Sequence, residues 1–385
     1  MSNIVFFSIP AHGHTNPTLA VVKELKQRHH TVYYFSYEEM REKIEATGAI
    51  FIPCDAYEPS MKVDETVGDD IAFATKVMVE MTLSMEDFLE QEINRIKPDV
   101  IVSDSMAIWG KSIALRRHIP LIISNTTFVF NKESSKGMKS SFSELMHLLK
   151  QLHQANKEIK RLTKRGYPFH RAMDLLETDV SISSIVYTSK EFQPASDTFP
   201  DTVTFIGPSI RETPQTYPKK RKFRIYISMG TVVQESKDFY QTCVEAFQHP
   251  DCEVIIVVGS DVDLTSFPQV EGITLAHRVD QIAVLKETDV FLSHCGMNSV
   301  NESLYYGVPL LTHPITKEQE GNAGRVEQLR AGKRLEGLTK QELQKGVEEV
   351  LTNPIYKEEA IRIQQSFKAC PHAKGAADII ESIIK

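Results

Sequence analysis

The sequence predicts an α/β protein built from two doubly wound, Rossmann-like domains. Its 385 residues exceed the roughly 250 to 300 residues over which a single hydrophobic core usually grows. Short apolar runs, typical of strands buried on both faces, alternate with stretches of helical periodicity. This alternation begins again after residues 208–222, a proline-containing and charged segment, so we place the domain boundary there.

In the first half, residues 4–9 form a continuous apolar run that predicts a buried strand ending at Pro10-Ala11-His12-Gly13-His14. Asn16 is suited to cap a helix that begins at Pro17 and continues to Arg28. Such alternation implies right-handed crossovers and a parallel sheet. The further elements expected are strands at 31–35, 49–52, 99–103, 120–124 and 183–188, helices at 37–46 and 108–117, and a mainly helical stretch at 130–180.

The second half repeats this organisation. A strand is expected at 223–228, ending at Met229-Gly230-Thr231, followed by a helix and by strands at 253–258 and 291–294. Residues 376–385 have a helical pattern. The two halves therefore predict two sheets of similar architecture.

The composition excludes several classes of protein. Apolar residues make up 41% and charged residues 25%, the balance of an ordinary globular chain. The net charge of -7 disfavours nucleic acid as the main partner, because phosphate backbones are bound by an excess of Lys and Arg. The basic run 219–222 can be a surface patch, but next to Pro214 and Pro218 we interpret it as a solvated linker.

The five cysteines are scattered without metal-ligand spacing, and their odd number fits a reducing compartment, so we expect a cytoplasmic protein. No window reaches the roughly eighteen apolar residues of a spanning helix, and the N-terminus has no export pattern. We therefore expect no membrane association. The lack of a long apolar surface helix favours a monomer.

The clearest motif is Ser293-His294-Cys295-Gly296-Met297-Asn298-Ser299, which follows a predicted strand and opens a predicted helix. A glycine at this point lets the backbone approach a ligand, and the helix N-terminus offers N–H groups and partial positive charge to a diphosphate. His294 and Ser299 can add donors, and Thr231 on the neighbouring strand can reach the same phosphates. Such an anion site needs no metal.

This motif and the residues after it resemble the UDP-dependent glycosyltransferases of the GT-B fold, in particular the bacterial macrolide-type and YjiC-like members. The resemblance covers nearly the whole chain. Its most specific part, residues 278–319, looks like the family's nucleotide-sugar signature: HCGxNS, then Glu, then GVP, then an acidic residue with Gln.

The resemblance implies two doubly wound domains facing across a cleft. Residues 1–207 would bind the acceptor, with a helix at 370–385 packing back on this domain; 208–222 would be the linker and 223–369 would bind the nucleotide-sugar. It also implies a UDP-sugar as co-substrate, a small-molecule acceptor, no required cofactor and no metal.

The resemblance assigns roles to individual residues of the donor site. His294 would contact the diphosphate, with Gly296 in the same turn, and Glu302 would accept the ribose hydroxyls. Arg278 stands where plant members have a Trp that stacks on the base, and a guanidinium plane can stack on uracil in its place. This favours uridine over thymidine. The other donor-binding residues expected are Thr231, Val279, Gln281, Asn298, Ser299, Glu318 and Gln319, of which the last two would hold the sugar hydroxyls.

The second motif, Gly13-His14-Thr15-Asn16-Pro17, lies where the family has its catalytic base. By resemblance His14 would take the proton of the acceptor hydroxyl, and Asp104 would orient the imidazole. Asp104 as a simple helix cap is the alternative. The implied reaction is direct displacement at the anomeric carbon with inversion, and the departing diphosphate would be stabilised by the donor site.

Several residues have two interpretations. His12, Phe128 and Phe130 are candidate acceptor-binding residues, although aromatic residues at strand ends also pack in cores. Asp261 and Asp263 imitate a metal-binding DxD motif, but they precede an apparent loop, and a helix terminus is already available for the phosphates, so we disfavour a metal site there.

The sequence thus predicts an inverting glycosyltransferase that moves a sugar, glucose by preference, from a UDP-sugar to a hydroxyl group of a small acceptor such as a flavonoid, phenol or macrolide. The alternatives are a sugar-nucleotide epimerase of the same fold, a lipid-linked cell-wall transferase, and a non-catalytic nucleotide-sugar binding protein.

Overall fold

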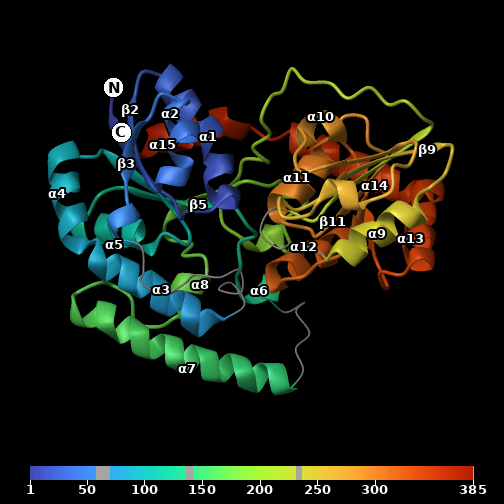
Figure 1. Ribbon diagram of the computed structural model, residues 1–385. Helices are drawn as coiled ribbons and strands as arrows, with labels where there is room; N and C mark the ends of the chain where they lie inside the picture. The colour runs from blue at the N-terminus through green and yellow to red at the C-terminus, as the bar shows by residue number, and fades with distance from the viewer. Residues whose placement is uncertain (58–69, 136–141, 231–235, 385) are drawn as a thin grey trace. The chain divides into compact units, whose positions relative to one another are not determined.

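The structure, a computed structural model, describes residues 1–57, 70–135, 142–230 and 236–384 (Figure 1). The chain divides into two compact units. Residues 1–209 together with 370–385 form the first unit, and residues 210–369 form the second. The C-terminal segment therefore belongs to the same unit as the N-terminus.

In the described part of the first unit, seven parallel strands form one sheet in the order β3-β2-β1-β4-β5-β6-β7. The central strands are buried and mainly apolar because both faces of the sheet are covered by helices. The strands are β1 (Asn3–Phe7), β2 (Thr31–Ser36), β3 (Ile50–Pro53), β4 (Val100–Asp104), β5 (Leu121–Asn125), β6 (Ser183–Val186) and β7 (Val203–Phe205).

Successive side chains of β1 point to opposite faces of the sheet. Ile4 and Phe6 pack with α1, α2 and α15, whereas Val5 and Phe7 pack with α3, α4 and α5. The long helix α7 lies outside this second layer and packs along α3 (Figure 1). The helices are α1 (His12–Gln27), α2 (Arg41–Glu45), α3 (Ile71–Ser84), α4 (Glu86–Ile96), α5 (Ile108–Arg117), α6 (Lys132–Ser135), α7 (Phe142–Lys164), α8 (Met173–Leu176) and α15 (His372–Ile384).

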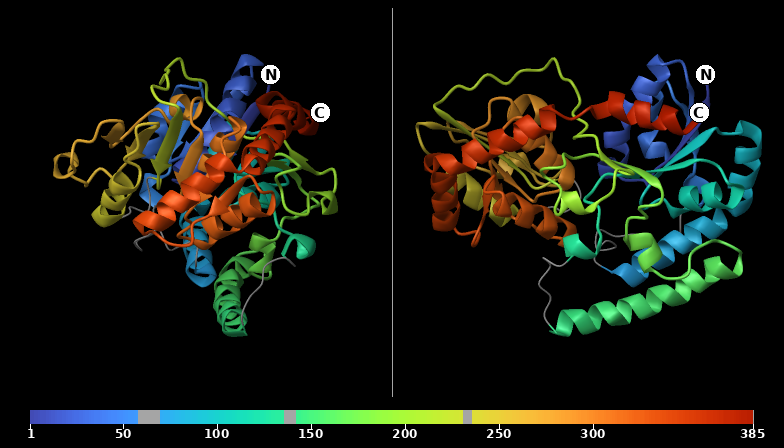
Figure 2. Two further views of the ribbon diagram at one scale, coloured as in Figure 1. Left: turned by 90° about the vertical axis from the view of Figure 1, so that its right-hand side faces the viewer. Right: turned by 180° about the vertical axis from the view of Figure 1, so that it is seen from behind.

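Helix α15 lies beside α1, as Figure 2 shows. Its buried residues Ala376, Ala377 and Ile380 belong to the same hydrophobic cluster as the inner face of α1. At the edge of this contact, Arg28 donates to Asp378 at 2.6 Å and the His30 ring lies 2.8 Å from Glu381. The last helix is thus part of the first unit's core.

The second unit also has a parallel sheet, in which six described strands follow the order β10-β9-β8-β11-β12-β13. Helices α9 and α13 cover the face that carries Ile225 and Ile227, while Tyr226 lies on the opposite face and stacks on Phe291. The elements are β8 (Phe223–Ser228), α9 (Lys237–Ala246), β9 (Cys252–Val257), β10 (Ile273–Ala276), α10 (Gln281–Leu285), β11 (Val290–Ser293), α11 (Met297–Tyr305), β12 (Leu310–Thr312), α12 (Lys317–Gln328), β13 (Gly332–Arg334), α13 (Lys340–Thr352) and α14 (Pro354–Lys368).

Each sheet has one point at which the strand order reverses. In the first sheet β1 lies between β2 and β4, and in the second sheet β8 lies between β9 and β11. The helices that follow the two adjacent strands leave toward opposite faces, which opens a crevice at the carboxyl ends of those strands. The residues after β1 and β4, and those after β8 and β11, therefore lie where such sheets bind ligands.

The predicted start of the first helix was wrong. Helix α1 begins at His12, not at Pro17, so Asn16 is not its cap. Ala11 has an extended backbone, and its carbonyl already accepts from the N–H groups of His14 and Thr15. Pro17 is tolerated inside the helix at the cost of one backbone hydrogen bond. His14 is consequently the third residue of a helix, where the helix fixes its direction.

Candidate active site

The first candidate site joins β1 and β4 of the first unit. The Nδ1 atom of His14 lies 2.7 Å from Oδ2 of Asp104, the last residue of β4. The Asp104 side chain is 1% exposed and the His14 side chain 18% exposed, so the carboxylate is buried behind an imidazole that is open to solvent. Because an ionised carboxylate can only accept, Nδ1 carries the proton and the lone pair of the neutral ring is on Nε2.

Asp104 serves two purposes at once. Its Oδ1 accepts from the backbone N–H of Met106 at 2.8 Å, which closes the turn that leads into α5, while Oδ2 faces His14. The two interpretations offered by the sequence, a turn-closing cap and an orienting carboxylate, thus use different oxygens of one carboxylate.

Thr126, just after β5, was not predicted to belong to this site. Its buried hydroxyl oxygen lies 3.1 Å from the same Nδ1 of His14. The nitrogen is therefore held from two neighbouring strand ends. A polar residue directly after a buried strand was the only signal in the sequence that pointed to it.

The predicted acceptor-binding residues are in different environments. His12 is half-buried, with Nδ1 3.2 Å from the Lys43 ammonium and Nε2 3.3 Å from Glu39. Phe128 is buried and packs against Phe192 with ring centroids 5.5 Å apart, whereas Phe130 is exposed. Of the two phenylalanines, Phe130 is thus the one available to a ligand.

The second candidate site follows β11 and β8 of the second unit and is centred on His294. Its ring lies against two glycines: a Cβ on Gly230 would come within 2.6 Å of the ring, and a Cβ on Gly296 within 2.8 Å of Nε2. Burial lowers the pKa of His294 to about 4, so the ring is neutral near pH 7. Its Nδ1 is buried and makes no hydrogen bond to the described part of the chain. A neutral imidazole with such a nitrogen fits a hydrogen-bonding role toward a ligand.

The turn after His294 has an unusual backbone conformation. Cys295 has φ of 68°, in the left-handed region that a residue with a side chain rarely adopts. Its N–H donates to Ser293 Oγ at 3.1 Å, and its carbonyl accepts from the buried Nδ2 of Asn322 at 2.9 Å. Burial raises the pKa of the Cys295 thiol, which makes it a packing residue and a poor nucleophile. Asn322 was not predicted, since only the tertiary structure brings α12 to this turn.

Helix α11 begins directly after this turn, with Gly296 as its N-cap residue. The first turn of an α-helix directs its N–H groups outward along the axis, and here these belong to Met297, Asn298 and Ser299. Together with the helix dipole they favour a negatively charged group. The predicted phosphate-binding residues Asn298 and Ser299 are therefore placed by the helix itself. Thr231, predicted to contact the same phosphates, lies outside the described residues.

Glu302 lies one turn further along α11 and is linked to Gln281. The Gln281 Nε2 donates to Glu302 Oε2 at 2.6 Å, and the Gln281 Oε1 accepts from the Tyr226 hydroxyl at 3.0 Å. Burial raises the pKa of Glu302, an effect that the bond from Gln281 opposes. Before Gln281, Arg278 is exposed and Val279 half-buried at the start of the turn.

The predicted sugar-binding residues belong to the first turn of α12. Glu318 is exposed, and its Oε1 accepts from Asn322 at 3.2 Å. Gln319 completes a capping box: its Oε1 accepts from the N–H groups of Ile315 and Thr316 at 2.8 and 3.1 Å. A sugar contact from Gln319 would therefore use its amide nitrogen.

Among the described residues, no group of three or more His, Cys, Asp or Glu side chains could hold a metal ion. In the DxD-like sequence, Asp263 caps a short helix by accepting from Thr265, and Asp261 accepts from Ser260. No helix in the described ranges is long and apolar enough to cross a membrane.

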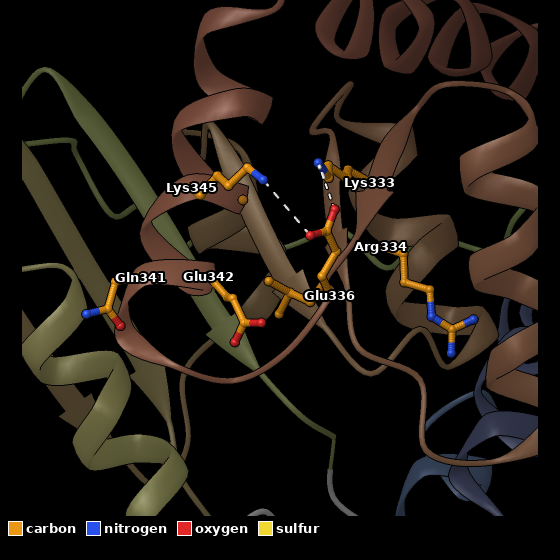
Figure 3. Close-up of a pocket in the computed structure, with 8 residues that line it drawn as sticks. Lys333, Arg334, Glu336, Gln341, Glu342 and Lys345 are labelled. Atoms are coloured by element: carbon orange, nitrogen blue, oxygen red, sulfur yellow. Dashed lines mark ion pairs between the residues drawn. The ribbon is translucent and has the colours of Figure 1, made fainter.

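A shallow pocket of about 110 Å³ lies between β13 and α13 (Figure 3). Its charged residues face one another: Glu336 lies 3.9 Å from Lys333 and 4.0 Å from Lys345. Arg334 is bound by both carboxylate oxygens of Glu320. These charges neutralise each other, and the pocket contains none of the predicted site residues.

Comparison with known proteins identifies the family. Residues 225–373 match the model of the family described as UDP-glucoronosyl and UDP-glucosyl transferase. The uncharacterized UDP-glucosyltransferase YdhE of Bacillus subtilis is 31% identical over 100% of this chain and 99% of its own length. The NDP-glycosyltransferase YjiC of Bacillus licheniformis is 31% identical over 99% of this chain and 98% of its own.

A solved structure, that of the glycotransferase of kitacinnamycin, has a TM-score of 0.85 and 26% identity, and covers 100% of this chain and 99% of its own. The predicted GT-B architecture of two Rossmann-like parallel sheets is thereby confirmed, as is the resemblance drawn from the HCGMNS signature. The chain therefore belongs to the UDP-glucoronosyl and UDP-glucosyl transferase family and is a YjiC-like, macrolide-type glycosyltransferase.

Proposed function

We propose that the enzyme transfers a sugar, glucose by preference, from a UDP-sugar to a hydroxyl group of a small acceptor such as a flavonoid, phenol or macrolide, with inversion at the anomeric carbon. The observation that carries the proposal is the pair of His14 and Asp104 at the reversal point of the first sheet. The name of YdhE of Bacillus subtilis supports a UDP-glucosyl donor, and the name of the structural relative supports a natural-product acceptor.

His14 is the general base of this mechanism. An alcohol or phenol is a weak nucleophile while protonated, so Nε2 accepts the acceptor's hydroxyl proton as the oxygen attacks the anomeric carbon. Asp104 keeps the proton on Nδ1 and stabilises the imidazolium that forms. The bond from the anomeric carbon to the diphosphate oxygen breaks as the new glycosidic bond forms, and UDP departs with the negative charge.

The donor side stabilises this charge without a covalent intermediate. The N–H groups at the start of α11 donate to the diphosphate, which the neutral His294 ring also contacts. Glu302 accepts from the ribose hydroxyls, Arg278 stacks on uracil, and Glu318 and the Gln319 amide nitrogen bind the sugar. Asn298, Ser299, Thr231 and Val279 complete the proposed donor site.

The test is incubation of the purified enzyme with UDP-glucose and a panel of flavonoid, phenol and macrolide acceptors, followed by mass spectrometry and proton NMR. We expect free UDP and a product heavier by one hexosyl unit with a β-linkage. Release of UDP that does not depend on an acceptor, or a change of the donor sugar's configuration without transfer, would instead support hydrolysis or epimerisation. UDP binding without turnover of any donor would support a non-catalytic binding protein.

A further inference from the structure

The side chain of Tyr226 is buried in the second sheet, yet its hydroxyl group begins a hydrogen-bonded chain that ends at Glu302. Tyr226 donates to Gln281 Oε1 at 3.0 Å, and Gln281 Nε2 donates to Glu302 Oε2 at 2.6 Å. Tyr226 is on β8, Gln281 opens α10 and Glu302 is on α11. Three elements separated in the sequence are thus joined through one side-chain amide.

The direction of both hydrogen bonds follows from chemistry. An ionised carboxylate can only accept, so the amide must present its nitrogen to Glu302 and its oxygen to Tyr226. The tyrosine hydroxyl then has to donate. Without that donor, the oxygen of the Gln281 amide loses its hydrogen bond, and only the bond to Glu302 still fixes the amide.

The Tyr226 ring and the backbone at Gln281 are held in place by further contacts. The Tyr226 ring stacks on Phe291 with centroids 4.7 Å apart. The backbone at Gln281 is fixed by Asp280, which caps α10 and accepts from Arg211 and Thr213 of the preceding extended segment. The Gln281 amide therefore links a ring and a backbone that are held in place to the Glu302 carboxylate.

We propose that Tyr226 is a positioning residue that acts through Gln281 to aim the Glu302 carboxylate at the ribose hydroxyls, and that it thereby sets the preference for ribonucleotide over deoxyribonucleotide donors. This inference rests on the proposed function, in which Glu302 accepts from the ribose. With Oε2 occupied by Gln281, Glu302 offers Oε1 to the ribose.

Partial burial of the Glu302 carboxylate increases the contribution of its hydrogen bonds to the free energy of binding. Glu302 is half-buried and desolvation raises its pKa, so its charged form depends on the hydrogen bonds that it accepts. A half-buried acceptor held by a hydrogen bond favours a ligand hydroxyl and leaves an analogue without that hydroxyl facing an unsatisfied carboxylate. The hydrogen-bonded chain from Tyr226 to Glu302 therefore affects which nucleotide is preferred and not only how tightly a nucleotide binds.

The test compares the binding of UDP and 2′-deoxy-UDP by calorimetry in the wild-type enzyme and in Tyr226→Phe, which keeps the stacked ring and removes only the hydroxyl. The wild type should bind UDP at least about tenfold more tightly than 2′-deoxy-UDP. In Tyr226→Phe this ratio should fall about three- to tenfold, mainly because UDP binds more weakly. In a Gln281→Ala background, Tyr226→Phe should change the ratio no further.

Tyr34→Phe is the matched control. Tyr34 is also buried, stacks on Phe6 and is bonded through its hydroxyl to Thr18 at 2.7 Å, but it belongs to the first unit. This variant should lower Tm to a comparable extent and leave the nucleotide ratio unchanged, which separates positioning from a general loss of stability.

Two results overturn the inference in distinguishable ways. If Glu302→Ala abolishes the preference for UDP over 2′-deoxy-UDP but Tyr226→Phe keeps the wild-type preference, Tyr226 does not position the carboxylate. The proposed donor site then still stands. If the wild type shows no preference between the two nucleotides, or if Glu302→Ala keeps that preference, the assignment of Glu302 to the ribose fails and the inference fails with it.

Discussion

The imidazole of His14 lies 2.7 Å from the carboxylate of Asp104, although 90 residues separate them in the chain. The contact exists because β1 and β4 are neighbours in the sheet while β2 and β3 lie on the other side of β1. A histidine that follows one strand thereby contacts an aspartate that ends another.

His14→Ala should reduce kcat by about a hundred- to ten-thousand-fold, because the acceptor would lose its general base. UDP affinity should stay within about twofold of wild type, since the proposed donor residues belong to the second unit. Steady-state kinetics and calorimetry check both quantities. Retention of more than about a tenth of the wild-type kcat would refute the assignment.

Asp104→Asn separates the two roles of Asp104. An Asn oxygen can still accept from the Met106 N–H, whereas its NH₂ would face His14 Nδ1 and force the proton onto Nε2. We expect near-wild-type Tm with a loss of kcat of about a hundred- to ten-thousand-fold. Asp104→Ala should add a loss of about 1 kcal/mol in stability, because the turn also loses its cap. An active Asn variant would mean that Asp104 acts only as a cap.

Gly296→Ala should weaken UDP binding by about tenfold or more, because the new Cβ would lie 2.8 Å from Nε2 of His294 and displace the ring. The backbone at Gly296 has φ of -57°, so the substitution itself is unstrained. Gly230→Ala should cost about 1–2 kcal/mol more stability, since Gly230 has a left-handed backbone. In a His294→Ala background the effect of Gly296→Ala on UDP binding should largely disappear. An undiminished effect would show that the new Cβ does not act by displacing the His294 ring.

His294 should make the protein less stable as the pH falls. Burial lowers its pKa from 6.5 to about 4, so between these values the unfolded chain binds a proton that the folded chain does not. Between about pH 7 and about pH 5 this should remove roughly 2 kcal/mol of the free energy of unfolding. Urea unfolding of wild type and His294→Gln at both pH values isolates the effect. Equal pH dependence in the two proteins would show that His294 titrates normally.

Asn322→Ala should lower stability by about 1–3 kcal/mol, because the buried Cys295 carbonyl loses its hydrogen bond. The left-handed backbone of Cys295 would then lose one of its supports, and the start of α11 would be less fixed. We therefore expect a raised KM for the UDP-sugar as well as a lower Tm. An exposed residue of the same helix, Gln328, provides the control as Gln328→Ala.

Several strands and helices and both motifs were readable from the sequence because their signals are local, whereas the helices at 71–96 and the strands at 273–276 and 310–312 were not predicted. Continuous apolar runs gave the buried strands, and the HCGMNS signature marked the junction of β11 and α11. The start of α1 was misplaced, because Asn16-Pro17 is a strong local helix-start signal. The structure starts the helix at His12, with the Ala11 carbonyl accepting its first backbone bonds.

The tertiary structure alone decided which strand ends and which helices meet. The sequence placed Gln281 and Glu302 in a donor site by resemblance, but only the fold joins them to Tyr226. Likewise, the folded second unit brings Asn322 to Cys295, and the folded first unit brings Thr126 to His14. The physical reason is that periodicity records which face of an element is buried, whereas the order of strands follows from how distant segments pack against one another.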